Sequence, residues 1–231
     1  MIVFQNVTKI YRSHPDTGAI VALDNVSFKI KEKEFVVILG RSGAGKTTLL
    51  KLLIGEEKPT RGRIFFDGKE VSKTSPKDFP MLRREIGVIF QDYKLLPSKT
   101  VYENIAYAME VIGASPEEIE KDIPKVLELV GLAERAFNFP EELSGGEKQR
   151  ATIARALIHR PRVILADEPT GNLDPYHTQD IIHLLEKIHE FGTTVVLSTH
   201  DKEIINQLER RTITLEKGKV IRDEEKGSFI L

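Results

Sequence analysis

The chain has 231 residues, and its 34 Lys or Arg against 35 Asp or Glu give a formal net charge of −1. This balance gives no support to nucleic-acid binding driven by a global positive field, and the absence of cysteine excludes disulfides and cysteine-ligated zinc. No apolar run approaches the roughly 20 residues that span a bilayer, and the first residues do not resemble a signal peptide. We therefore expect one large α/β domain in the cytoplasm, attached to a membrane only through a partner.

The N-terminal part predicts a strand, a glycine-rich loop and a helix. A first strand region, residues 2–11, ends at Tyr11. Residues 35–39 are apolar and largely β-branched, which predicts a buried parallel strand, and residues 48–53 predict the helix that follows the loop. The loop between them matches the phosphate-binding pattern G-x-x-x-x-G-K-[ST]. Its residues are Gly40, Arg41, Ser42, Gly43, Ala44, Gly45, Lys46 and Thr47.

This phosphate loop has the chemistry of a triphosphate cradle. Its three glycines allow positive φ and a close approach of the backbone to phosphate oxygens, while the helix that starts near Thr48 adds unpaired N–H groups. We expect Lys46 to reach the β- and γ-phosphates of the nucleotide and Thr47 to offer its hydroxyl to Mg²⁺. The sequence therefore predicts a site for a nucleoside triphosphate with Mg²⁺.

The chain has a split organisation. Strand signals occupy about residues 1–91 and 161–231, whereas about 92–160 is mainly helical. In this helical insertion, Ser115 followed by Pro116 predicts the start of a helix. Asp-Gly within 64–69 and Lys-Gly within 214–220 each predict a hairpin turn.

Two uncharged or weakly basic side chains stand directly after predicted strands. Gln91 follows the strand over 86–90, where its amide oxygen can bind Mg²⁺ or the attacking water. His200 follows the strand over 195–199, where it can donate a hydrogen bond to the γ-phosphate. We interpret the other five histidines as ordinary surface or core residues; they are His14, His159, His177, His183 and His189.

Another predicted strand, over 163–166, ends in two carboxylates. Adjacent carboxylates at a buried strand end are costly without a cation or a proton nearby. We expect Asp167 to hold the metal through water and Glu168 to polarise the attacking water. A solvated strand end is the alternative, which the phosphate loop upstream disfavours.

Residues 143–147 read Leu-Ser-Gly-Gly-Glu and are followed by Lys-Gln-Arg. Together with the phosphate loop and the two carboxylates, they resemble the ABC ATPases over essentially the whole chain. The resemblance implies an α/β fold of the P-loop NTPase (RecA-like) type, with an antiparallel β subdomain and an inserted α-helical subdomain. It also implies ATP hydrolysis by a homodimer, in which Ser144, Gly145 and Gly146 of one copy face the γ-phosphate held by the phosphate loop of the other.

Two further assignments depend on this resemblance. Residues 172–174, Asn-Leu-Asp, resemble the D-loop that crosses the dimer interface, and Asp174 is the last residue of this segment. Without the other motifs, the three residues would be interpreted as a turn. Tyr11 resembles the aromatic side chain that stacks on adenine, although a core tyrosine is the alternative.

A narrower resemblance concerns residues 49–59, 82–97 and 100–104, which are similar to the ATPases of bacterial cell division. It implies an FtsX-like integral membrane partner and ATP-driven motion that is relayed outward to peptidoglycan hydrolases. ATPases that power lipoprotein release or macrolide-type export share the fold and the motifs, so they remain the alternative.

Exposed apolar residues after Gln91 are where we expect the membrane partner to dock, unless they pack the helical insertion. The residues concerned are Tyr93, Leu95, Leu96 and Tyr102.

Soluble ABC ATPases that act on DNA or ribosomes are disfavoured, because the chain has one copy of each motif and no sustained heptads. A nucleotide-binding scaffold without turnover is disfavoured by the presence of both Glu168 and His200.

Overall fold

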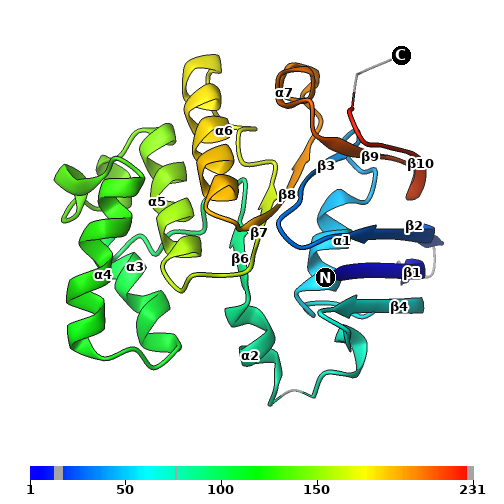
Figure 1. Cartoon of the computed structure of the whole chain (residues 1–231), viewed down its shortest axis with the longest axis horizontal. Helices are drawn as coiled ribbons and strands as arrows, with labels where there is room; N and C mark the ends of the chain where they lie inside the picture. Colours follow the sequence, from blue (N-terminus) through cyan, green and yellow to red (C-terminus); the bar gives the residue numbers. More distant parts are fainter. Residues whose placement is uncertain (13–17, 76, 228–231) are drawn as a thin grey trace. The chain divides into compact units, whose positions relative to one another are not determined.

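The computed structural model describes residues 1–12, 18–75 and 77–227. The chain folds into two compact units, of which the first is Met1–Arg83 with Thr194–Leu231 and the second is Arg84–Thr193. Both mix helices and strands (Figure 1). The mixed architecture agrees with the expected α/β class.

The first unit contains an antiparallel sheet in which β1 pairs with both β2 and β4, and the three lie side by side (Figure 1). Outward and inward residues alternate in the second half of β2, so one face is buried. Asp67 and Gly68, with φ of 49° and 78°, turn β4 into β5 and confirm the predicted Asp-Gly hairpin. The order of this sheet is β2 (Ala19–Ile30), β1 (Ile2–Arg12), β4 (Arg61–Phe66) and β5 (Lys69–Glu70).

The first unit also contains parallel strands that carry the phosphate loop. The strand β3 lies between β8 and β9 and is parallel to both, and β10 pairs with β9 through the predicted Lys-Gly turn. Every residue of β3 and β8 is buried, as expected of strands covered on both faces. These strands are β3 (Phe35–Leu39), β8 (Thr194–Thr199), β9 (Arg211–Glu216) and β10 (Lys219–Glu224). The helices here are α1 (Lys46–Leu53), α2 (Phe79–Arg84, at the boundary) and α7 (Lys202–Leu208), with a 3₁₀ turn at Val71–Lys73.

The second unit has two parallel strands and four longer helices, with α3, α4 and α5 packed against one another. Side-chain caps begin all four helices, and a full capping box precedes three of them. Ser115 is such a cap with Pro116 at the first helical position, which confirms the predicted start. The elements are β6 (Ile86–Ile89), α3 (Val101–Val111), α4 (Pro116–Leu129), α5 (Gly145–Leu157), β7 (Val163–Asp167) and α6 (Pro175–Glu190), with 3₁₀ turns at Ala133–Arg135 and Pro140–Glu142.

The second unit extends further than the predicted insertion over 92–160. It also includes β6, β7 and α6, because β6 pairs with β7 and α5 packs against both β6 and α6. The boundaries of the predicted subdomains stay a prediction.

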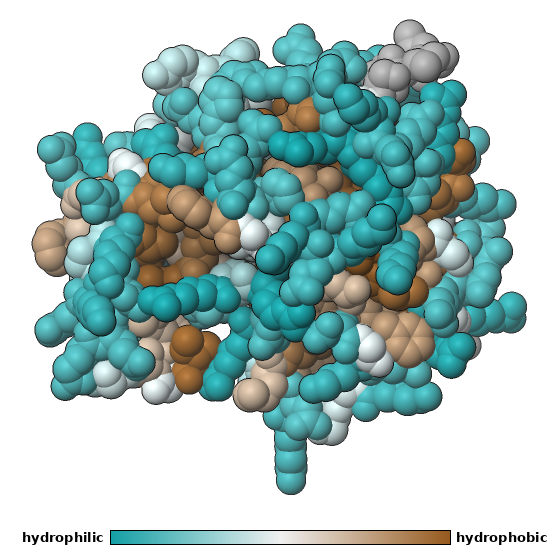
Figure 2. All heavy atoms as spheres, in the orientation of Figure 1, coloured by the Kyte–Doolittle hydropathy of each residue, from teal (hydrophilic) through white to brown (hydrophobic). Residues whose placement is uncertain are grey.

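The surface is dominated by hydrophilic side chains, with hydrophobic ones in separate patches on the visible face (Figure 2). Within residues 1–12, 18–75 and 77–227, no helix has both the length and the apolar character needed to cross a membrane.

Candidate functional site

The phosphate loop leaves the end of β3 and enters α1. Gly43 and Gly45 have φ of 78° and 106°, a region that residues with a side chain rarely adopt. A Cβ on Gly45 would lie 2.6 Å from the Ala22 carbonyl oxygen and 2.8 Å from Leu23 Cδ2. Both conformation and space therefore require glycine at position 45, directly before the first amides of α1.

Lys46 is held inside this loop. Its Nζ donates to the carbonyl oxygens of Gly40 at 2.6 Å and Arg41 at 3.1 Å, and the residue is only 6% exposed. Thr47, the next residue, is exposed. The loop thus combines a buried ammonium group, the N–H groups at the start of α1 and an exposed hydroxyl, which together fit a phosphate group with a metal ion.

His200 lies beside the phosphate loop. The pairing of β3 with β8 places Leu39 opposite Thr199. Gly40 and His200 are therefore the first residues after two neighbouring strands. The Gly40 amide donates to the Thr199 carbonyl at 3.3 Å, which closes this edge. His200 is exposed there.

Tyr11 lies near α1 in the same unit. Its hydroxyl donates to Glu57 at 2.8 Å, and Lys9 Nζ lies 4.9 Å from its ring centroid. Burial raises the pKa of Tyr11, an effect that a hydrogen bond with Thr48 opposes. Since Lys9 covers one face of the ring, adenine stacking would need the other face, and that role stays a prediction.

The two carboxylates of the second unit stand at the end of β7. Asp167, the last residue of this buried strand, is 8% exposed. Glu168 has a φ of 48°, which costs a residue with a side chain about 1–2 kcal/mol, and its carbonyl accepts from the Gly171 amide at 3.1 Å. Strained backbone at such a position is characteristic of functional sites.

Gln91 is held close to these carboxylates by the sheet and by Asn172. The pairing of Ile89 with Ala166 brings Gln91 level with Glu168, each two residues after this pair. Asn172 Nδ2 donates to the Gln91 carbonyl at 3.0 Å, and Gln91 Nε2 lies 3.4 Å from Asn172 Oδ1. Sequence reasoning treats Asn172 only as part of the D-loop, and no local pattern reveals its bond to Gln91.

The Leu-Ser-Gly-Gly-Glu segment begins α5, with Ser144 as the N-cap. Ser144 and Glu147 form a capping box: the Ser144 hydroxyl accepts from the Glu147 amide at 3.3 Å, and the Glu147 carboxylate accepts from the Ser144 amide at 2.8 Å. This backbone bond lowers the pKa of Glu147, which Arg135 Nε also contacts at 3.0 Å. The amides of Gly145 and Gly146 lie outside the hydrogen-bond ladder of the helix and are suited to an anion.

Asp174 caps α6 and binds His177. Its Oδ1 accepts from the His177 amide at 3.0 Å, and its Oδ2 lies 2.6 Å from His177 Nδ1. Hydrogen bonds from the backbone and the ring of His177 lower the pKa of Asp174. The ring also lies against Gly146, where an added Cβ would come within 2.9 Å of His177 Cγ. Sequence reasoning treats His177 as an ordinary residue, although its position three residues after a capping aspartate indicates that the two side chains can interact. Another of the histidines treated in this way, His14, lies outside the described residues.

The expected metal ligands divide between the units, with Thr47 in the first and Gln91 and Asp167 in the second. In the part of the chain that the structure describes, no three or more histidines and carboxylates gather as a metal cluster. An ion bound by few protein ligands together with phosphate oxygens and water, as Mg²⁺ commonly is, remains compatible with these residues.

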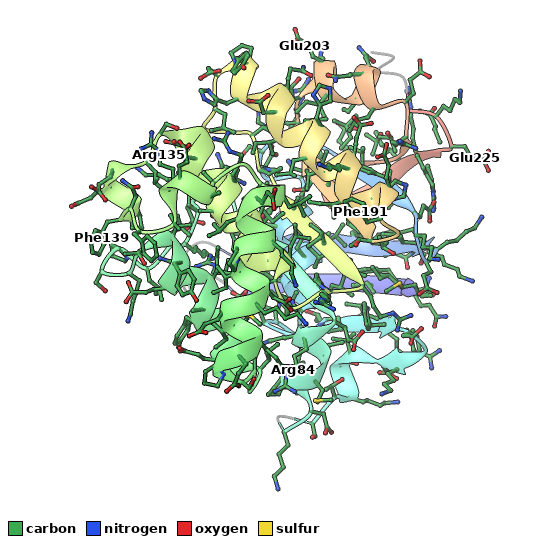
Figure 3. All side chains as sticks on the ribbon, turned by 60° about the vertical axis from the view of Figure 1, so that its left-hand side comes forward. Arg84, Arg135, Phe139, Phe191, Glu203 and Glu225 are labelled. Atoms are coloured by element: carbon green, nitrogen blue, oxygen red, sulfur yellow. The ribbon has the colours of Figure 1, made fainter. Side chains whose placement is uncertain are left out.

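The residues expected to dock a membrane partner are all half-buried: Tyr93, Leu95, Leu96 and Tyr102. The Tyr102 ring stacks on Phe137 with centroids 6.0 Å apart. Phe137 is 77% exposed and Phe139 41% exposed, and Figure 3 shows Phe139 on the segment between α4 and α5. Sequence reasoning misses both phenylalanines, of which Phe137 extends the apolar surface at Tyr102.

Comparisons with known proteins agree with this interpretation of the motifs. The family model described as ABC transporter matches residues 23–171. The chain is 47% identical over 221 residues to the cell division ATP-binding protein FtsE of Bacillus subtilis, with 96% of each protein covered. It is 49% identical over 229 residues to FtsE of Streptococcus pneumoniae, with 99% of this chain and 97% of the relative covered.

Among solved structures, the chain is similar to the dimeric ATP-binding cassette MJ0796 in a post-hydrolysis state bound to ADP and Pi. The TM-score is 0.89 at 38% identity, with 99% of this chain and 100% of the other covered.

Proposed function

Because the chain belongs to the ABC transporter family, we propose that it is the ATP-hydrolysing subunit of a membrane complex that acts in bacterial cell division. The FtsE proteins of two bacteria, at 47% and 49% identity over nearly their full lengths, support this role over lipoprotein release or macrolide-type export. The observation that carries the ATPase activity is the phosphate loop itself, with buried Lys46 and with His200 beside Gly40.

In the first unit, the phosphate loop binds the nucleotide. Gly43 and Gly45 bring the backbone close to phosphate oxygens, and Lys46 exchanges its bonds to the loop carbonyls for bonds to the β- and γ-phosphates. His200 donates a hydrogen bond to the γ-phosphate. Arg41, Ser42, Ala44 and Thr48 contribute backbone or hydroxyl groups, and Tyr11 stacks on adenine.

In the second unit, Glu168 polarises the attacking water and Gln91 orients it. Asn172 holds Gln91 through its main-chain carbonyl and its side-chain amide, and the backbone of Glu168 is left-handed directly after β7. A Mg²⁺ ion would neutralise charge on the phosphates, with Thr47, Gln91 and Asp167 as its protein ligands.

The active form is a homodimer, in which each copy presents the start of α5 to the nucleotide of the other. Ser144, Gly145 and Gly146 meet the γ-phosphate, and Asp174 lies at the contact between copies. The similarity to a cassette that is itself dimeric supports the homodimer. Loss of the γ-phosphate removes the bridge, so ATP biases an equilibrium between closed and open dimers.

The dimer works at the cytoplasmic face of the inner membrane on an FtsX-like partner, through which it regulates peptidoglycan hydrolysis. The partner docks near Tyr93, Leu95, Leu96 and Tyr102. The exposed Phe137, which stacks on Tyr102, supports an apolar contact there.

The test of the ATPase proposal is the substitution Glu168→Gln. The variant keeps the shape of the side chain but loses the base, so it is expected to bind ATP, hydrolyse it at least 100-fold more slowly, about the contribution of a general base, and elute as a dimer with ATP and Mg²⁺. The control Lys46→Ala should lose nucleotide affinity and stay monomeric. Rapid turnover by Glu168→Gln, or its elution as a monomer, would refute the assignment.

The cell-division role needs a separate experiment. Glu168→Gln, locked with ATP and Mg²⁺, serves as bait in detergent-solubilised membranes, and the stoichiometric membrane protein is identified. An FtsX-like protein supports the proposal, whereas an export permease would leave the ATPase chemistry intact and assign the chain to transport.

A further inference from the structure

The loop that follows Gln91 has an unusual backbone. Tyr93 and Lys94 are consecutive residues with φ of 58° and 49°. Each left-handed residue that carries a side chain costs about 1–2 kcal/mol, so surrounding contacts must hold this conformation. The residues that hold the loop therefore control its shape.

Those contacts come from the middle of α5. Arg155 donates from Nη1 to the Lys94 carbonyl at 2.7 Å and from Nη2 to the Tyr93 carbonyl at 3.1 Å. Thr152 Oγ1 lies 3.1 Å from the same Tyr93 carbonyl and 3.1 Å from the Lys148 carbonyl of its own helix, and its one proton can serve either. The planar guanidinium presents two donors in a rigid fork to the two carbonyls, whereas the ammonium group of a lysine is a point charge without that fixed geometry. Arg155 thus fixes the relation of two successive peptide groups to α5.

The side chain of Tyr93 connects the loop to the other end of the same helix. Its hydroxyl lies 3.3 Å from the position that a Cβ on Gly145 would occupy, and the residue is half-buried. The loop therefore contacts α5 at its first residue through the Tyr93 hydroxyl and two to three turns later through the Tyr93 and Lys94 carbonyls. Residues 145–155 belong to one continuous helix, so both contacts of the loop are made to the same rigid element.

We propose that Arg155 is a positioning residue which, with Tyr93, couples nucleotide contact at the start of α5 to the conformation of the loop over 92–97. This proposal rests on the proposed function, in which Gly145 meets the γ-phosphate bound by a second copy. A phosphate at the Gly145 amide constrains the adjacent Tyr93 hydroxyl, and the two carbonyls held by Arg155 move with it. Leu95 and Leu96, next along the loop, then report the nucleotide state to whatever docks on them.

Amide hydrogen exchange tests this coupling within the full chain. In the Glu168→Gln background, peptides covering 92–97 are compared with and without ATP and Mg²⁺, under conditions in which the dimer is verified by size. The parent is expected to show at least threefold slower exchange with ATP. Adding Arg155→Lys should remove this difference while ATP-dependent dimerisation persists, whereas Arg150→Lys, the same change earlier on α5, should retain it.

The outcomes separate coupling from simple support of the fold. A support role would lower the thermal midpoint of Arg155→Lys but leave the ATP-dependent difference over 92–97, and this result would overturn the proposal. Tyr93→Phe keeps the ring, removes only the hydroxyl and does not alter α5, so it tests the same connection if Arg155→Lys fails to fold; retention of the difference would again overturn it. A parent that does not dimerise would refute the proposed function itself.

Discussion

The contact between Gly146 and His177 gives a quantitative prediction for Gly146→Ala. Gly146 lies in the first turn of α5, and an added Cβ would collide with the His177 ring, including its Cγ at 2.9 Å. The ring cannot move without disturbing its bond to Asp174, whose Oδ2 is 2.6 Å from Nδ1. The substitution therefore combines a favourable backbone effect with an unfavourable steric one.

The two effects have opposite signs and similar sizes. Alanine in place of glycine stabilises a helix by about 1 kcal/mol, whereas overpacking a filled site costs about 1–3 kcal/mol. Gly146→Ala should therefore lower the free energy of unfolding by about 0–2 kcal/mol in the natural chain. In a His177→Ala background the collision disappears, and the same change should stabilise by about 1 kcal/mol.

The assay is a double-mutant cycle. Urea unfolding of each protein is monitored by circular dichroism in the absence of nucleotide. The four proteins are the natural chain, each single variant and the double variant, and the coupling is expected to be about 1–3 kcal/mol. Equal effects of Gly146→Ala in both backgrounds would show that His177 does not occupy the space beside Gly146.

Burial lowers the pKa of His159 below its ordinary value of 6.5, so the folded state favours the neutral ring; stability should be complete above that pH and fall as the pH drops through 6.5 toward the folded pKa. His159→Leu should flatten this dependence in urea titrations between pH 7.5 and 5.5, and an unchanged slope would count against the buried neutral ring. Ser115→Ala removes the cap of α4 and should lower the free energy of unfolding by about 1 kcal/mol. Ser115→Asp keeps a capping side chain and should retain most of the stability, so equal losses in the two variants would contradict the capping role. Asn172→Ala frees Gln91 and should lower kcat more than it raises KM for ATP, because the bonds position a group rather than bind substrate; a change confined to KM would argue against this.

Much of the fold follows from local patterns. The phosphate loop is recognisable because only glycine readily permits the left-handed backbone at Gly43 and Gly45, and both hairpins are predictable because Asp-Gly and Lys-Gly meet the same requirement. The runs that form β3 and β7 are predictable as buried strands since both faces of a parallel strand are apolar. Ser115 and Ser144 are predictable as helix starts because a cap and its glutamate lie three residues apart.

The hydrogen bonds that join these motifs are not predictable in this way, since they link residues far apart in the chain. Gln91 meets Asn172 across 81 positions, and Arg155 meets the carbonyl of Tyr93 across 62. The identity of neither residue indicates which partner it binds, and a backbone carbonyl is present at every position of the sequence. The sequence by itself determined which chemical groups the protein carries and in which local conformation, because propensity, capping and glycine geometry act over a few residues. Only the tertiary structure decided which of those groups touch, because chain-distant hydrogen bonds and packing depend on how the elements fold against one another within each unit.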